Sequence, residues 1–323
     1  MKHPTVSVII PTLNAGRTIT LLLDSLLANV VPPLEIILVD DGSSDDTADI
    51  VGRYAGVIFL RNHRSKGAGG ARNTGAEAAC GDILLFTDSD CIVPTDWIAR
   101  IVAAFAGGGV AAVAGGYSGH AGGTFIGHFA DLELRLRRKD FPERVETAVS
   151  NNFAVRNDIF RKVNGFPEEY EGATVEDLIC SYRVSRQGAI RWLSDNGVRH
   201  HFHETLAGYL RQQRAFARDT VLAFRRHSEL STVRSHHGRQ LYLEIVLSLA
   251  AIGMLPFEPR VAAGVILAVP VMHLPLIAET YRALGVMGVV RTVSLIPVKN
   301  INIILGILQG IARLPWCQRS HHG

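Results

Sequence analysis

Two aspartates one residue apart, Asp88 and Asp90, follow directly on the short apolar run 83–86. Such a run is typical of a buried strand, and two like charges at its end are unfavourable unless a positive charge lies beside them. A divalent cation would supply that charge and would in turn hold a phosphate group. The pair therefore points to metal-assisted chemistry on a phosphorylated compound.

Polar residues also follow two earlier apolar runs, 6–10 and 35–39. These residues are Pro11, Thr12, Asn14, Asp40 and Asp41. Each group alone is compatible with an ordinary turn or helix cap. If the runs are parallel strands, however, all three groups meet at one edge of the sheet, which is where open α/β sheets bind ligands.

The elements that must position these residues alternate along the chain. Runs typical of strands lie at 6–10, 35–39, 57–60 and 83–86. The segments between them that are predicted to be helices are 17–28, 47–54 and 67–79. This alternation predicts an α/β fold in which a largely parallel sheet carries helices on both faces.

The glycine-rich segment 66–73 does not fit a dinucleotide-binding loop. That loop belongs after the first strand, where this chain has Pro11 and Thr12 instead. Lys66 and Arg72 are better interpreted as cations beside a helix start, where backbone N–H groups already favour a phosphate.

Composition limits the partners and the compartment. The 323 residues carry a formal charge of +3, which is too small to indicate nucleic acid as the main partner. The four cysteines show no CxxC spacing, so neither a zinc site nor a disulfide framework is expected, and a reducing cytosol fits. The first residues lead directly into a strand, which predicts no cleaved signal peptide.

Four segments together, 6–14, 36–47, 70–73 and 88–90, resemble the family 2 glycosyltransferases of GT-A fold in order and spacing. The resemblance implies a mixed, Rossmann-like sheet, a nucleotide-diphosphate-sugar donor and a divalent cation, Mg²⁺ or Mn²⁺. It implies metal binding by Asp88 and Asp90. The residues it implies at the nucleotide are Pro11, Thr12, Asn14, Asp40, Asp41, Lys66, Arg72 and Ser89.

The resemblance also assigns an acceptor side. In the family a Glu-Asp pair at a helix start supplies the general base, which implies Asp177 as base and Glu176 beside it. A base there would take the proton of a hydroxyl that attacks opposite the diphosphate, giving inversion at the anomeric carbon. The alternative is that both are favourable charges in the first turn of a helix. Relatives often carry a second aspartate where Ile179 stands, which bears on the acceptor pocket.

Three further segments have less definite roles. His200, His201 and His203 lie close together, and the resemblance places one near the diphosphate or metal without choosing among them. A short strand is expected at 111–114, and the glycine-rich stretch 107–123 around it is expected to loop around the sugar. The stretch 211–216 loosely resembles a motif of processive synthases and predicts a basic amphipathic helix that lies on the membrane or, through Arg214, lines the acceptor site.

The apolar residues are concentrated in the last third. We expect a catalytic domain at 1–225, with a nucleotide-sugar half at 1–110 and an acceptor half at 111–225. A membrane-associated helical region follows at 226–323. Its candidate spans are 241–256, 261–279 and 286–312, the last spanning or interfacial. The alternative is a soluble helical domain.

The basic clusters 135–139 and 211–239 favour an anionic membrane surface, and the positive-inside rule then places the catalytic domain in the cytoplasm at the cell inner membrane. The sequence thus predicts an inverting, metal-dependent glycosyltransferase that acts on an envelope glycan or lipid-linked acceptor. A sugar nucleotidyltransferase should open with a glycine-rich loop after the first strand. An inactive membrane scaffold should have lost its carboxylates.

Overall fold

The computed structural model describes residues 4–106, 108–170, 174–233 and 238–314. The chain forms two compact units, residues 1–205 and 206–323. The strands of the first unit are β1 (Val6–Thr12), β2 (Glu35–Asp40), β3 (Val57–Arg61), β4 (Ile83–Phe86), β5 (Cys91–Ile92), β6 (Val110–His120), β7 (Arg144–Val145), β8 (Phe153–Arg156) and β9 (Ala189–His200). Its helices are α1 (Ile19–Leu27), α2 (Thr47–Val51), α3 (Ala68–Ala78), α4 (Trp97–Ala104), α5 (Phe125–Arg138), α6 (Asn157–Lys162) and α7 (Glu176–Ser185), with a 3-10 turn η1 (Ser150–Asn152).

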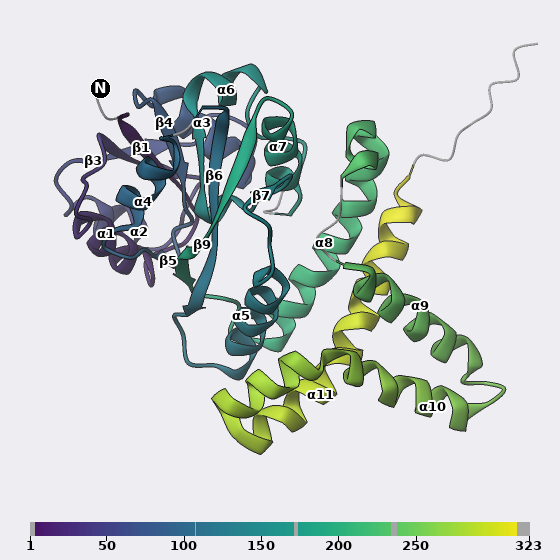
Figure 1. Cartoon of the computed structure of the whole chain (residues 1–323). Helices are drawn as coiled ribbons and strands as arrows, with labels where there is room; N and C mark the ends of the chain where they lie inside the picture. Colours follow the sequence, from purple (N-terminus) through teal and green to yellow (C-terminus); the bar gives the residue numbers. More distant parts are fainter. Residues whose placement is uncertain (1–3, 107, 171–173, 234–237, 315–323) are drawn as a thin grey trace, which may run out of the picture. The chain divides into compact units, whose positions relative to one another are not determined.

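The strands form one mixed sheet in the order β3-β2-β1-β4-β8-β6-β9-β5, with β7 paired to β9 (Figure 1). Strands β1 to β4 are parallel to one another, whereas β8 runs antiparallel to β4 and β6. The predicted mixed α/β sheet is therefore confirmed.

The strands β1, β2 and β4 are mostly apolar because both faces of the sheet are covered there. Along β1, Val8 and Ile10 point into a core with α1 and α4, whereas Ile9 points into a second core with α3, α6 and α7. Neighbouring strands β2 and β4 alternate in the same way, as the two-residue period of a strand requires. Burial on both faces explains the continuous β-branched runs.

The register brings the carboxyl ends of β1, β2 and β4 level. Thr12 lies opposite Asp40, and Ile9 lies opposite Phe86, so the residues that follow each strand share one edge. The predicted convergence of the polar clusters on that edge is a consequence of this pairing.

The short strand predicted at 111–114 is present, but it is longer than predicted, because β6 (Val110–His120) also covers most of the flanking glycine-rich residues that were predicted to loop, and for these the loop prediction is wrong. Its glycines serve close packing instead. A Cβ on Gly115 would meet the Asn152 side chain, and one on Gly116 would lie 3.2 Å from the Trp192 ring. Gly in a strand interior commonly marks such a close approach.

The second unit is helical, with α8 (Leu206–Arg226), η2 (Ser228–Thr232), α9 (Gly238–Met254), α10 (Pro259–Ala268), η3 (Val269–His273) and α11 (Leu274–Ala312). Helix α11 kinks at Gly285, whose φ is 66°. Helix α8 belongs to this unit because it packs along α11 at Gly306 and Gly310. A Cβ on Gly310 would lie 2.7 Å from the Arg218 carbonyl oxygen, so small residues set this helix spacing.

Among the described residues one helical stretch, Val269–Ala312, is long and apolar enough to cross a membrane, on length and composition alone. A buried core helix meets the same test, and 44% of its most apolar window is buried within the structure. Helices α9 and α10 have 17 and 10 residues. Both are shorter than the roughly 20 residues that a span requires.

Candidate active site

Asp41 fixes the end of β2 to the glycine-rich loop before α3. Its carboxylate accepts hydrogen bonds from Asn62 Nδ2 at 2.6 Å and from the Gly67 backbone N–H at 2.8 Å. Its own N–H donates to the Thr12 carbonyl at 2.8 Å. Asp40, which is buried, accepts from the Ser43 N–H at 3.0 Å. Both aspartates therefore hold the loops in place at this edge of the sheet.

The first loop is tied to the second by Asn14. This residue has a φ of 51°, and its side-chain oxygen accepts from the Ser44 N–H at 2.9 Å, while its own N–H donates to Ser43 Oγ at 2.8 Å. Asn tolerates this left-handed conformation better than most residues. Pro11 is buried in β1, opposite Val39. Asn14 and Pro11, both predicted at the nucleotide, therefore support the loops that follow β1 and β2.

Arg72 is the buried centre of the site. It donates from Nη2 to Asp88 Oδ1 at 2.8 Å and from Nη1 to Glu176 Oε1 at 2.9 Å. Its side chain is 2% exposed. Burial opposes the charge of the guanidinium, but the carboxylates of Asp88 and Glu176 outweigh burial and raise the pKa of Arg72. Arg72 thus joins the metal motif to the predicted acceptor side.

His200 is the one of the three histidines that reaches the metal motif. Its Nε2 lies 3.2 Å from Asp90 Oδ1, because β9 pairs with β5 so that His200 lies opposite Cys91. The Asp90 carbonyl accepts from the His201 N–H at 2.9 Å, which fixes the same junction. Burial alone would lower the pKa of His200, but Asp90 raises it.

The residues around Asp90 offer a donor set for a cation. Ligand atoms of Asp90, Cys91 and His200 lie within 4.8 Å of one another. Burial raises the pKa of the Cys91 thiol well above its usual value, so that sulfur stays protonated and is a poor ligand. Carboxylate oxygens with an imidazole remain, together with Asp88, 28% exposed, on the other side of the turn. Such a set fits a Mn²⁺ or Mg²⁺ ion that also binds substrate phosphates.

Glu176 and Asp177 have different surroundings at the start of α7. Glu176 is 2% exposed, is paired with Arg72, and accepts from the Thr174 N–H at 2.7 Å. The Asp177 carboxylate accepts instead from the N–H groups of Ser150 at 3.3 Å and Leu178 at 2.8 Å. Burial and then the neighbouring Glu176 raise the pKa of Asp177 to about 7. A carboxyl group with a pKa near neutrality is suited to take up a proton at neutral pH.

Three predicted residues remain, Lys66, Ser89 and Arg214. Lys66 is exposed at the start of the glycine-rich loop, and Ser89 is half-buried between Asp88 and Asp90. Arg214 belongs to α8 of the second unit, where its Nη2 donates to Asn302 Oδ1 at 2.6 Å.

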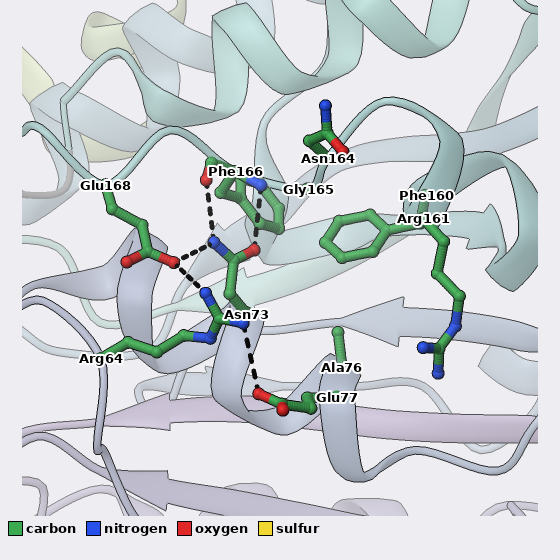
Figure 2. Close-up of a pocket in the computed structure, with 10 residues that line it drawn as sticks. All are labelled: Arg64, Asn73, Ala76, Glu77, Phe160, Arg161, Asn164, Gly165, Phe166 and Glu168. Carbon is green, nitrogen blue, oxygen red and sulfur yellow. Dashed lines mark hydrogen bonds and ion pairs between the residues drawn. The ribbon is translucent and has the colours of Figure 1, made fainter.

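A shallow cavity of about 520 Å³ lies behind α3, lined by residues of α3, α6 and the turn 164–168. Figure 2 shows Asn73 between the Phe166 backbone and Glu168, with which it makes hydrogen bonds of 2.7–2.9 Å. Arg64 also pairs with Glu168, at 2.9 Å. Asn73 thus fixes α3, and with it Arg72, against this turn.

Two residues that sequence reasoning did not single out face the site. The ring of Tyr117, in β6, contacts the ring of His200, with centroids 5.6 Å apart. The Arg138 guanidinium lies over the Tyr117 ring, 5.1 Å from the centroid of that ring. Arg138 was part of a basic cluster assigned to the membrane surface. No sequence signal separates it from the arginines beside it.

Residues 7–164 match the family described as Glycosyl transferase family 2. Glycosyltransferase AglE of Haloferax volcanii is 33% identical over 172 residues, which are 51% of this chain and 56% of the relative. The Escherichia coli protein WfaP, a UDP-Glc:α-D-GlcNAc-diphosphoundecaprenol β-1,3-glucosyltransferase, is 40% identical over 87 residues, 26% of this chain and 35% of the relative. The chain thus spans about half or less of the length of these relatives.

Among solved structures, this chain is similar to the mannosyltransferase PcManGT from Pyrobaculum calidifontis in complex with GDP-Man and Mn²⁺. The alignment covers 96% of this chain and 88% of the PcManGT chain. The TM-score is 0.62 at 21% sequence identity, which shows a shared fold.

Proposed function

The chain belongs to glycosyltransferase family 2, with a GT-A fold, and from that premise we propose that it moves a sugar from a nucleotide-diphosphate sugar to an acceptor hydroxyl with inversion at the anomeric carbon. The observation that carries the proposal is the pair of unlike carboxylate groups joined by Arg72. Arg72 donates to Asp88 of the metal motif and to Glu176, whose neighbour Asp177 has a pKa raised to about 7.

The donor would occupy the sheet edge next to the metal motif. Asp90 and His200, with Asp88, would hold a Mn²⁺ or Mg²⁺ ion, which when bound neutralises the diphosphate that leaves. PcManGT carries GDP-Man and Mn²⁺, which supports a donor and a cation of this kind. The exposed Lys66 and the loop held by Asp41 would lie toward the nucleotide.

Asp177 would act as the general base. Its carboxylate takes the proton of the acceptor hydroxyl as the new carbon–oxygen bond forms, and the bond between the sugar and the diphosphate breaks on the opposite side. A carboxylate with an ordinary pKa near 3.8 would be a weaker base at neutral pH. Glu176, bound to Arg72, would position Asp177 and the acceptor side rather than exchange protons.

The acceptor would be an envelope glycan or a lipid-linked sugar at the inner membrane. The apolar helical stretch Val269–Ala312 supports membrane attachment. By the positive-inside rule the first unit would then lie in the cytoplasm. The name of WfaP includes a diphosphoundecaprenol acceptor, which supports a lipid-linked class. In this proposal Arg214 and α8 contribute to the membrane-proximal unit.

A donor screen tests the proposal. Purified protein is incubated with a panel of UDP-, GDP- and dTDP-sugars, Mn²⁺ and membrane lipid extract, and products are identified by mass spectrometry. We expect one donor to label a lipid or glycan only when Mn²⁺ or Mg²⁺ is present. Asp177→Asn should bind that donor and fail to transfer it. Failure of the wild-type protein to transfer any sugar from the panel would contradict the proposal.

A further inference from the structure

Arg138 differs from the other arginines at the end of α5. Arg135 and Arg137 pair with carboxylates one turn earlier on the same helix, Asp131 at 3.0 Å and Glu133 at 2.7 Å. Among the residues that the structure describes, no carboxylate pairs with Arg138. Its Nη1 atom is buried and has no hydrogen-bond partner there.

A buried guanidinium donor without an acceptor is unfavourable, because the group has lost its water without gaining a hydrogen bond. Burial, with the charge of Arg137, lowers the pKa of Arg138, whereas the charge and a hydrogen bond of Tyr117 and the charge of Asp177 oppose that change. The Nη1 atom remains without an acceptor. Unexplained buried donors in a native protein commonly await a ligand or water. The planar fork of a guanidinium matches phosphate and carboxylate oxygens.

The surroundings of Arg138 indicate which substrate it faces. The Tyr117 ring carries the Arg138 guanidinium over its face and also contacts the rings of His200 and Phe202, with centroids 5.6 and 5.1 Å away. The charge of Asp177, the proposed base, also acts on Arg138. This interaction associates Arg138 with the acceptor side of the site.

We propose that Arg138 binds an anionic oxygen of the acceptor, as a phosphate ester supplies it, with its guanidinium supported by the face of Tyr117. This rests on the proposed function and specifies its acceptor as a phosphate-bearing molecule. The donor diphosphate would be neutralised by the cation that Asp88, Asp90 and His200 would hold, so Arg138 is left for a second phosphate, that of the acceptor. The acceptor hydroxyl then lies within reach of Asp177.

The test compares Arg138→Gln with Lys139→Gln. Lys139 is the next residue and its side chain is exposed, so this control removes the same positive charge from the surface. Transfer to membrane lipid extract, donor hydrolysis without acceptor, and donor affinity by calorimetry are measured for each. We expect Arg138→Gln to raise the KM for the extracted acceptor by about 10- to 100-fold, the effect of losing a charged hydrogen bond. Its donor affinity and donor hydrolysis should stay within twofold of wild type. Arg138→Lys should restore part of the loss, and Lys139→Gln should match wild type throughout.

Competition with small probes identifies the charge. Geranyl phosphate should inhibit transfer by the wild-type protein and by Lys139→Gln, and its inhibition should weaken at least tenfold in Arg138→Gln. Geraniol, the same molecule without the phosphate, should inhibit wild type and Arg138→Gln equally. Inorganic phosphate should inhibit wild type more than Arg138→Gln if the phosphate group alone binds Arg138.

Three results would overturn the assignment. An unchanged acceptor KM in Arg138→Gln would remove Arg138 from the acceptor site. A weakened donor affinity would assign the guanidinium to the donor diphosphate. Equal inhibition of wild type and Arg138→Gln by geranyl phosphate would exclude a phosphate as its ligand. Each differs from failure of the proposed function itself, in which the wild-type protein transfers no sugar.

Discussion

Replacing Asp177 by asparagine should stop transfer and at the same time stabilise the folded first unit above neutral pH. Folding raises the pKa of this carboxyl from 3.8 to about 7, chiefly through burial and then through Glu176. Between these two values the folded state binds a proton that the unfolded state has released. The stability of the wild-type protein therefore falls as the pH rises from about 4 to about 7.

The size of the effect follows from the change in pKa. A difference of about three pKa units corresponds to about 4 kcal/mol, which is an upper value for the penalty of the ionised carboxylate above pH 7. Asparagine carries no charge and retains an oxygen that can accept from Ser150 or Leu178. Asp177→Asn should therefore be more stable than wild type by up to about 4 kcal/mol at pH 8 and nearly equal to it at pH 4.

Urea unfolding followed by tryptophan fluorescence suits this test, because Trp97 and Trp192 both lie in the first unit. Asp140→Asn is the control, since its carboxylate is 87% exposed and its loss should change stability by less than about 0.5 kcal/mol at any pH. The reasoning is refuted if Asp177→Asn is destabilised at pH 8, or if its difference from wild type does not change with pH.

The remaining predictions concern the metal, the buried arginine, the pH profile and the helical unit. Asp90→Ala should weaken Mn²⁺ affinity at least tenfold by electron paramagnetic resonance, and unchanged affinity would move the cation elsewhere. Arg72→Leu leaves Glu176 buried without its cation and should lower the stability of the first unit by about 3–5 kcal/mol in the same urea assay; an unchanged urea midpoint would show that the pair contributes nothing. Wild-type kcat/KM should rise about tenfold from pH 6 to pH 8, because a base with a pKa of about 7 loses its proton in that range, and a flat profile would exclude it. The side chain introduced by Gly306→Leu would meet the Arg214 carbonyl oxygen, so this variant should destabilise the packing of α8 on α11 by about 1–3 kcal/mol. A thermal unfolding midpoint equal to that of wild type would contradict this.

The sheet edge could be predicted from the sequence because its determinants are local. Apolar runs of strand length, each followed at once by polar residues, fix where a strand ends, and parallel pairing then brings those ends together. Asp41, Asp88 and Asp90 needed no tertiary information to be selected. The alternation of strand and helix likewise predicts the α/β class.

The connections between these residues could not be predicted, because they depend on long-range packing. His200 was one of three candidates until the pairing of β9 with β5 placed it against Asp90. Arg72 was assigned to the nucleotide, and its bonds to Asp88 and Glu176 join residues 16 and 104 positions away.

The strand β6 shows the same limit in a different way. Its glycines resemble a loop in sequence, and only the close approach of Asn152 and Trp192 explains why a strand needs them. Arg138 is similar, because a basic cluster on a helix is ordinarily solvated, and one of its members turns inward over Tyr117 only in the folded unit.

The anomeric configuration of the transferred sugar tests the central claim most directly. Once the donor is found, proton NMR of the product formed by wild type and by Asp177→Asn reports both the stereochemistry and the need for the base. We expect the wild-type product to carry the anomeric configuration opposite to that of the donor, and Asp177→Asn to form no product while still binding the donor. A product with retained configuration, or undiminished transfer by Asp177→Asn, would contradict the account.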